Sequence, residues 1–226
     1  MPTIAIIEDF PLMLTAVKNL LMEDPDLQVV ATAAHGKELD AILSTHAVEV
    51  LLLDLGMATG YFEPISAIKR ARETYPALKI IVLTSYDAIP YVRDVIKAGA
   101  HGYLLKDDVE TLDLPAKIRT VMQGGRVFSA RIEHLLYADH LVRPLLFAEE
   151  QIAILRLMAQ DCDNEEAMAR ETGLTPLEVS YHVTLLYARL KIPGAFLANP
   201  THRRTAVLKA LEWGLIPALR AKDIPS

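Results

Sequence analysis

The chain has 226 residues and a mass of 25.0 kDa, with 52% apolar residues, 23% charged residues and a net charge of −6. This composition supports a buried core and argues against disorder, and the length suits one large domain or two ordinary ones. No apolar run approaches the roughly 18 residues of a membrane helix, and the single cysteine, Cys162, excludes an internal disulfide. We therefore expect a cytoplasmic protein that does not bind a membrane.

The first 122 residues alternate short apolar runs with stretches of helical periodicity. The apolar runs are residues 4–7, 27–30, 48–53, 80–83 and 102–105. The helical stretches are residues 12–22, 37–43, 64–74, 89–98 and 109–122. Apolar strands that alternate with helices are typical of a parallel sheet covered on both faces. The pattern predicts a doubly wound α/β domain over residues 1–122, with a five-stranded parallel sheet.

The rest of the chain contains a connecting segment and a helical domain. Gly124-Gly125 ends the last helix, and residues 123–147 have a mixed pattern that we interpret as a partly helical linker. Four further helices are predicted at residues 148–159, 164–171, 176–190 and 201–213. Thr175 is placed as an N-cap with Glu178 three residues later, so a short turn joins the second and third of these helices. Two short helices joined in this way form a helix-turn-helix, which predicts an all-α domain over residues 148–226.

Polar side chains follow the carboxyl ends of several predicted strands. They are Glu8, Asp9, Asp54, Thr84 and Lys106. If the strand order is 2-1-3-4-5, strands one and three are neighbours, and three carboxylates meet in one crevice. Such carboxylates repel one another unless a cation is present, and hard oxygen ligands beside a phosphate suit Mg²⁺. A carboxylate beside Mg²⁺ and an ammonium group can accept a phosphoryl group as an aspartyl phosphate.

Glu8-Asp9, Asp54, Thr84-Ser85, Gly102-Tyr103 and Lys106 resemble, in type and spacing, the receiver domain of two-component response regulators. The resemblance implies that Asp54 is the phosphoacceptor. It implies a Mg²⁺ site formed by Asp9, Asp54, the backbone carbonyl of Gly56 and, through water, Glu8. Thr84 and Lys106 would bind the phosphoryl oxygens, and Tyr103 would change rotamer with Thr84. Ala58 departs from the family, which usually has proline there, and we expect the departure to alter the stiffness of the loop.

A competing class is a Mg²⁺-dependent phosphatase of related architecture. Such enzymes usually need a second aspartate two residues after the nucleophile as a general acid. Gly56 stands at that position in this chain. We therefore expect no enzyme, and at most slow hydrolysis of the chain's own phosphate.

Residues 148–216 resemble the helix-turn-helix of NarL/LuxR-type regulators, which implies that the helix at residues 176–190 lies in the major groove of DNA. The family normally has a lysine or arginine where Ser180 stands, a polar residue where Leu185 stands, and a threonine where Glu178 stands. Residues 145–226 carry nine basic and ten acidic side chains, so the basic excess usual in a DNA-binding domain is missing.

Two interpretations of this domain remain open. In the first, it binds DNA as a homodimer and controls transcription, with contacts from Ser180, Tyr181, Thr184, Arg189, Arg203 and Arg204. In the second, the domain has lost ordinary DNA binding, and Tyr181 and Leu185 anchor a protein partner. In both, a histidine kinase or a small phosphodonor would phosphorylate Asp54, and the new charge would bias a two-state equilibrium.

Overall fold

The computed structural model of the chain describes residues 1–57, 62–108, 113–193, 197 and 199–217. The described residues form two compact units. The first unit contains residues 1–122 and 126–135, and the second contains residues 123–125 and those from 136 onward. In this described part of the chain, no helix has the length and apolar character needed to cross a membrane. The segment expected as a linker, residues 123–147, is therefore shared between the two units.

The first unit is built on a parallel sheet with the order β2-β1-β3-β4-β5-β6. The strands are β1 (Thr3–Ile7), β2 (Gln28–Ala33), β3 (Val50–Leu53), β4 (Lys79–Thr84), β5 (Gly102–Leu105) and β6 (Val127–Phe128). Every residue of β3 and β5 is buried, which explains why these runs are apolar without alternation. The predicted doubly wound α/β fold and its order 2-1-3-4-5 are confirmed.

The prediction of five strands was wrong by one, because a sixth strand extends the sheet. Val127 of β6 pairs with Gly102, and Phe128 pairs with Tyr103. A side chain at Gly102 would place its Cβ 2.5 Å from Val127 Cγ2, so this glycine lets β6 approach β5. Because β6 has only two residues, it shows no periodic pattern of apolar side chains. For that reason the sequence did not reveal this strand.

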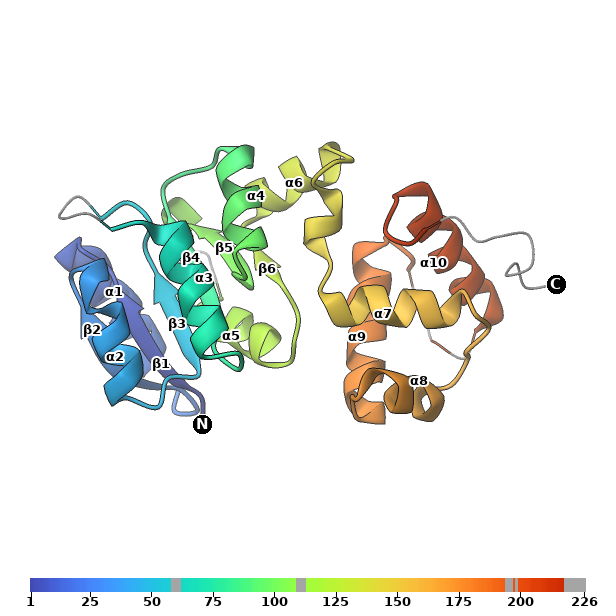
Figure 1. Ribbon diagram of the computed structural model, residues 1–226, viewed down its shortest axis with the longest axis horizontal. Coiled ribbons are helices and arrows are strands. Elements are labelled where there is room, and N and C mark those ends of the chain that lie inside the picture. Colours follow the sequence, from blue (N-terminus) through green and yellow to red (C-terminus); the bar gives the residue numbers. More distant parts are fainter. Residues whose placement is uncertain (58–61, 109–112, 194–196, 198, 218–226) are drawn as a thin grey trace. The chain divides into compact units, whose positions relative to one another are not determined.

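Helices cover both faces of this sheet (Figure 1). They are α1 (Pro11–Met22), α2 (Leu39–Thr45), α3 (Pro64–Thr74), α4 (Ile89–Lys97) and α5 (Leu114–Met122). Short 3₁₀ turns are η1 (Gly36–Glu38) and η2 (Lys106–Asp108), and α6 (Ala130–Ala138) follows β6 and includes residues of both units. On one face, Val17 and Leu21 of α1 and Ile118 of α5 pack into one core with the strands. Prolines begin α1 and α3, where the missing backbone N–H leaves no hydrogen bond unmade. Residues 109–112, at the start of the helix predicted over 109–122, lie outside the described residues.

The second unit is helical. It contains η3 (Arg143–Leu146), α7 (Glu149–Met158), α8 (Glu165–Thr172), α9 (Pro176–Arg189) and α10 (Pro200–Glu212). The turn between α8 and α9 has Gly173 at a φ of 75°, which favours glycine because other residues are strained there. Thr175 Oγ1 accepts a hydrogen bond from Glu178 N, and Thr175 N donates to Glu178 Oε2. The predicted capping box and helix-turn-helix are confirmed.

His101 precedes β5 and is held neutral by its surroundings. Its Nδ1 accepts a hydrogen bond from Ile80 N at 3.2 Å, and its backbone N–H donates to Ile80 O at 2.7 Å. Burial, assisted by the charges of Lys79, Arg72 and Arg126, lowers the pKa of His101 to about 3. The folded unit therefore resists protonation of a histidine that an unfolded chain would protonate at about pH 6.5.

This lowered pKa predicts a loss of stability in mild acid. Between about pH 6.5 and 3 the unfolded chain binds a proton that the folded chain does not, so stability falls by up to about 1.4 kcal/mol per pH unit. His101→Asn keeps an acceptor without the titration. When the pH falls from about 7.5 to 5, the free energy of unfolding measured in urea should decrease by about 2 kcal/mol less in His101→Asn than in the native chain. His134→Asn, at an exposed position of α6, is the control that retains the native pH dependence. Equal losses in native and His101→Asn chains would contradict the assignment.

Candidate phosphoacceptor and metal site

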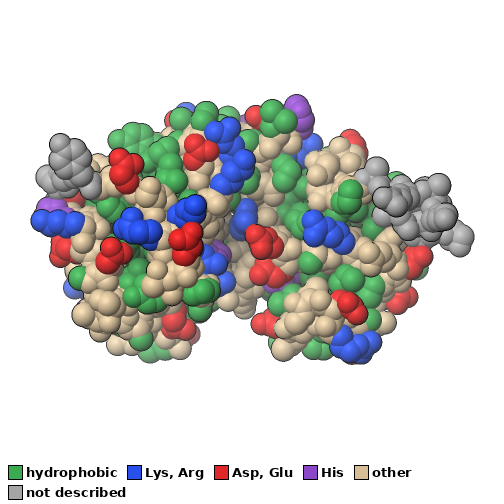
Figure 2. All heavy atoms as spheres, viewed as in Figure 1, with side chains coloured by type: hydrophobic (Ala, Val, Ile, Leu, Met, Phe, Trp, Pro, Cys, Tyr) green, Lys and Arg blue, Asp and Glu red, His purple; other side chains and the backbone are tan. Residues whose placement is uncertain are grey.

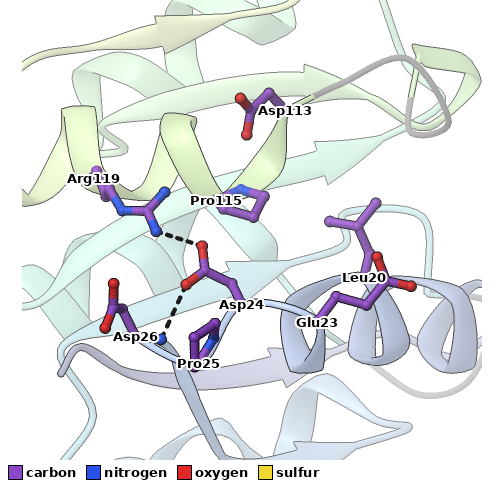
Figure 3. Close-up of a pocket in the computed structure, with 8 residues that line it drawn as sticks. All are labelled: Leu20, Glu23, Asp24, Pro25, Asp26, Asp113, Pro115 and Arg119. Atoms are coloured by element: carbon purple, nitrogen blue, oxygen red, sulfur yellow. Dashed lines mark hydrogen bonds and ion pairs between the residues drawn. The ribbon is translucent and has the colours of Figure 1, made fainter.

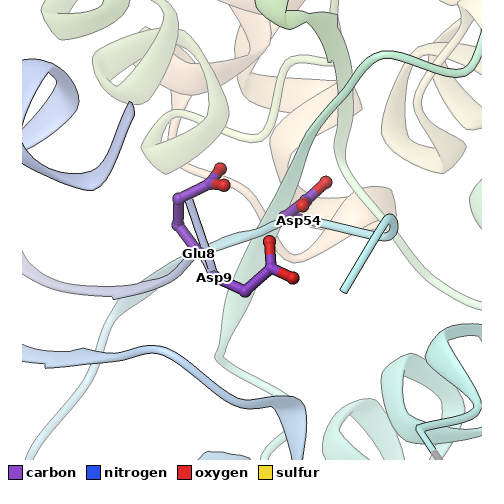
Figure 4. A group of neighbouring side chains, drawn as sticks. All are labelled: Glu8, Asp9 and Asp54. Carbon is purple, nitrogen blue, oxygen red and sulfur yellow. The ribbon is translucent and has the colours of Figure 1, made fainter. Parts of the chain in front are cut away.

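Three carboxylates meet at the carboxyl edge of the sheet, where β1 and β3 end (Figure 4). Ile7 pairs with Leu53, and Asp54 N donates to Ile7 O at 2.9 Å, so the residues that follow the two strands are neighbours. Glu8, Asp9 and Asp54 each offer an oxygen within 4.8 Å of the others. Hard oxygen donors at this spacing fit a divalent cation such as Mg²⁺.

Lys106 is placed between two of these carboxylates. Its Nζ lies 2.8 Å from Glu8 Oε1 and 2.9 Å from Asp54 Oδ2. The Glu8 and Asp54 side chains are 3% exposed and that of Lys106 is 13% exposed, so solvent screens the interactions weakly. The ammonium group thus lies where it could contact an oxygen of any group attached to Asp54.

Burial and charge set the protonation of this cluster. Burial raises the pKa of Glu8, the hydrogen bond from Lys106 opposes that rise, and the nearby charge of Asp54 adds to it. Burial would lower the pKa of Lys106, but its bonds to Glu8 and Asp54 outweigh burial and raise it. Three carboxyl groups share one ammonium group here, and an added cation would relieve the repulsion between them.

Thr84 and Tyr103 are linked through the backbone of Tyr86. Thr84, at the end of β4, is fully buried, and its Oγ1 accepts from Tyr86 N at 3.4 Å. The Tyr103 side chain is also fully buried, and its hydroxyl donates to Tyr86 O at 2.8 Å. Burial raises the pKa of Tyr103, so this phenol stays protonated as the donor. The sequence carried no signal for Tyr86 because its backbone, rather than its side chain, makes these bonds.

The loop after Asp54 is described only in part. Gly56 N donates to Asp54 Oδ1 at 3.0 Å, and the Tyr86 ring lies against Gly56. The role expected for the Gly56 carbonyl stays a prediction. Ala58, the expected departure from the family pattern, lies outside the described residues.

Residues 126–131 form further contacts close to this site. Leu105, which directly precedes Lys106, donates its backbone N–H to Ser129 Oγ at 2.8 Å. Arg131 of α6 pairs with Asp87, in the loop that also carries Tyr86. Sequence reasoning missed both contacts, because it assigned these residues to a linker.

A separate open hollow of about 570 Å³ lies between the end of α1 and the start of α5 (Figure 3). It is lined by Leu20, Glu23, Asp24, Pro25, Asp26, Asp113, Pro115 and Arg119. Arg119 pairs with Asp24, and Asp24 also accepts a hydrogen bond from Asp26 N at 3.0 Å. None of the three clustered carboxylates lines this hollow, so it is distinct from the site at the sheet edge.

The structure divides the predicted DNA contacts of the second unit into two groups. Ser180 and Thr184 are exposed on α9, Tyr181 is half-buried there, and Arg204 is exposed on α10. Arg189, in contrast, donates to Leu146 O, and Arg203 donates to Leu197 O at 3.3 Å and pairs with Asp163 at 3.9 Å. Two of the expected phosphate-binding cations are therefore engaged inside the unit.

Residues 4–119 match the family model described as the response regulator receiver domain. The nitrate/nitrite response regulator protein NarP of Escherichia coli is 31% identical over 202 residues, which cover 87% of this chain and 92% of NarP. The oxygen regulatory protein NreC of Staphylococcus epidermidis is 28% identical over 201 residues, which cover 84% of this chain and 91% of NreC.

Solved structures show the same fold. The isolated REC domain of RcsB from Salmonella enterica serovar Typhimurium, determined with the phosphomimetic BeF3−, is 26% identical with a TM-score of 0.55. The match covers 59% of this chain and 97% of the RcsB domain. An RcsB–DNA complex matches 90% of this chain and 98% of that chain at 21% identity, with a TM-score of 0.56. This second likeness shows that the architecture of both units is shared.

Proposed function

Because this chain belongs to the response regulator family, among regulators of the NarL/LuxR type, we propose that phosphorylation of Asp54 controls transcription through DNA binding by the second unit. One observation carries the assignment of the acceptor. Lys106 Nζ bridges the buried carboxylates of Glu8 and Asp54, at the edge where an aspartate with a neighbouring cation can be phosphorylated. The relatives named as transcriptional regulators, such as DesR of Bacillus subtilis, support the output.

Asp54 acts as the nucleophile. Its carboxylate oxygen forms a bond to phosphorus while the bond to the donor's leaving nitrogen or oxygen breaks, and the leaving group takes up a proton from water. Lys106 stabilises the charge that develops on the phosphoryl oxygens, and the Thr84 hydroxyl donates to one of them. Glu8, Asp9, Asp54 and the Gly56 carbonyl would hold Mg²⁺, which when bound neutralises phosphoryl charge. The donor is a histidine kinase or a small phosphodonor, and the phosphate is lost by slow self-hydrolysis.

The signal leaves the site through the loop after β4. Movement of Thr84 toward a phosphoryl oxygen pulls on Tyr86 N, and Tyr86 O is bonded to Tyr103. The same loop carries Asp87, which is paired with Arg131 of α6. A change in the conformation of this loop therefore alters the contacts of both Tyr103 and α6. The loop is thus a two-state element whose equilibrium phosphorylation biases. We propose that homodimerisation and DNA binding follow.

Incubation with acetyl phosphate and Mg²⁺ tests this function in the full chain. We expect the intact mass to rise by one phosphoryl unit, the oligomer to shift from monomer to dimer, and affinity for duplex DNA to increase. A folded chain that gains no phosphoryl unit under saturating donor would overturn the receiver assignment. A phosphorylated chain that binds no duplex would overturn the output assignment.

A further inference from the structure

One side of α9 carries an outward stripe of four residues. Leu177, Tyr181, Thr184 and Ala188 recur at the three- and four-residue intervals that place side chains on one face of a helix. Val179, Val183 and Leu186 lie on the opposite face and are buried. Leu177 is 81% exposed, Thr184 and Ala188 are exposed, and Tyr181 is half-buried. The outward stripe of α9 is therefore the face that a helix-turn-helix presents to DNA.

Two polar side chains, Thr184 in the stripe and Glu178 beside it, form hydrogen bonds to their own helix or its N-cap. The Thr184 hydroxyl donates to Ser180 O at 3.0 Å, so this hydroxyl is engaged within the helix while the residue is exposed. Glu178 Oε2 accepts from Thr175 N at 2.7 Å and from Thr175 Oγ1 at 2.8 Å. These bonds lower the pKa of Glu178 and hold its carboxylate at the N-cap. Apart from the Tyr181 hydroxyl, the outward stripe is consequently made of aliphatic and aromatic groups, and the exposed Ser180 lies beside it.

Three cations on or close to α9 are engaged in contacts within the second unit. Arg189 is the one Lys or Arg residue of α9, and it donates to Leu146 O. Lys209 Nζ donates to Leu190 O at 2.8 Å, and Lys191 Nζ lies 4.6 Å from the Tyr137 ring centre. The face shown in Figure 2 has basic and acidic side chains interspersed over this unit rather than gathered in a basic patch.

These observations bear on which bases α9 can recognise. In the major groove, guanine is read most often by Arg or Lys through O6 and N7, whereas thymine presents a methyl group that apolar side chains contact. The outward stripe has apolar side chains that can contact a thymine methyl group, and it has no Lys or Arg that could bind guanine. Building on the proposed function, we propose that α9 recognises half-sites of A·T base pairs through the thymine methyl groups, with Leu177 as a specificity-determining residue.

Selection of random duplexes by the acetyl phosphate-treated full chain tests the proposal. We expect the selected half-sites to contain A·T pairs at the positions under α9. Replacing thymine by deoxyuridine removes one methyl group and leaves base pairing intact. At a contacted position this should weaken binding about fourfold, the effect expected for one buried methyl group.

Variants then assign the contact to α9. In Leu177→Ser, at least one position should lose its discrimination between thymine and deoxyuridine, because the side chain that contacts the methyl is gone. Leu208→Ser, at an exposed position of α10, is the matched control and should discriminate as the native chain does.

The outcomes separate the two proposals. Selected half-sites that need guanine under α9, or thymines that deoxyuridine replaces without loss, would overturn methyl recognition while DNA binding stands. Failure of the phosphorylated chain to retain any duplex would overturn the proposed function, and methyl recognition with it.

Discussion

Asp54→Asn is expected to abolish phosphorylation of the chain. An amide is not a nucleophile toward phosphorus at neutral pH, and Asp54 is the cluster carboxylate bonded to Lys106 at the end of β3. After treatment with acetyl phosphate and Mg²⁺, the intact mass should remain that of the untreated protein. The dimer and the gain in duplex affinity should also be lost.

The matched control is Asp107→Asn, an exposed carboxylate one residue after Lys106. This variant should be phosphorylated as fully as the native chain. Circular dichroism of Asp54→Asn should match the native spectrum, since the amide occupies the volume of the carboxylate. A phosphoryl unit retained by a folded Asp54→Asn chain would show that another residue is the acceptor.

Lys106→Met is expected to produce the largest loss of stability at the site. It leaves the buried carboxylates of Glu8 and Asp54 without their cation, and removal of one partner from a buried ion pair costs about 3–5 kcal/mol. In urea unfolding at about pH 7, the free energy of unfolding should fall by an amount at the lower end of this range, because one carboxyl can bind a proton instead. Phosphorylation should slow as well, since the charge on the phosphoryl oxygens is less stabilised.

The dependence of this loss on pH and metal identifies its cause. With Lys106 gone, the folded chain binds a proton at the cluster that the unfolded chain has released, so the deficit should shrink as the pH falls from about 7 to 5. Added Mg²⁺ should restore stability for the same electrostatic reason. Lys97→Met, on the exposed surface of α4, is the control and should change stability little. A deficit that neither acid nor Mg²⁺ reduces would mean that Lys106 acts by packing.

Much of the candidate site was predictable because of where parallel strands end. Glu8, Asp54 and Lys106 each follow an apolar run, and the carboxyl ends of neighbouring parallel strands meet at one edge. The side-chain types then indicated a cation and a phosphate. Contacts made by backbone atoms, such as the bond from Tyr103 to Tyr86 O, were not predictable, since any residue can supply a carbonyl.

The sequence by itself determined the alternation of apolar strands with helices, the polar residues that follow those strands and the capped turn before α9. These features follow from local periodicity and residue type, and both can be read along the chain. Tertiary structure alone decided that β6 extends the sheet and that Arg189 and Arg203 contact carbonyls within their own unit. A two-residue strand has no period of its own, and a flexible cation pairs with whichever acceptor the fold brings near it.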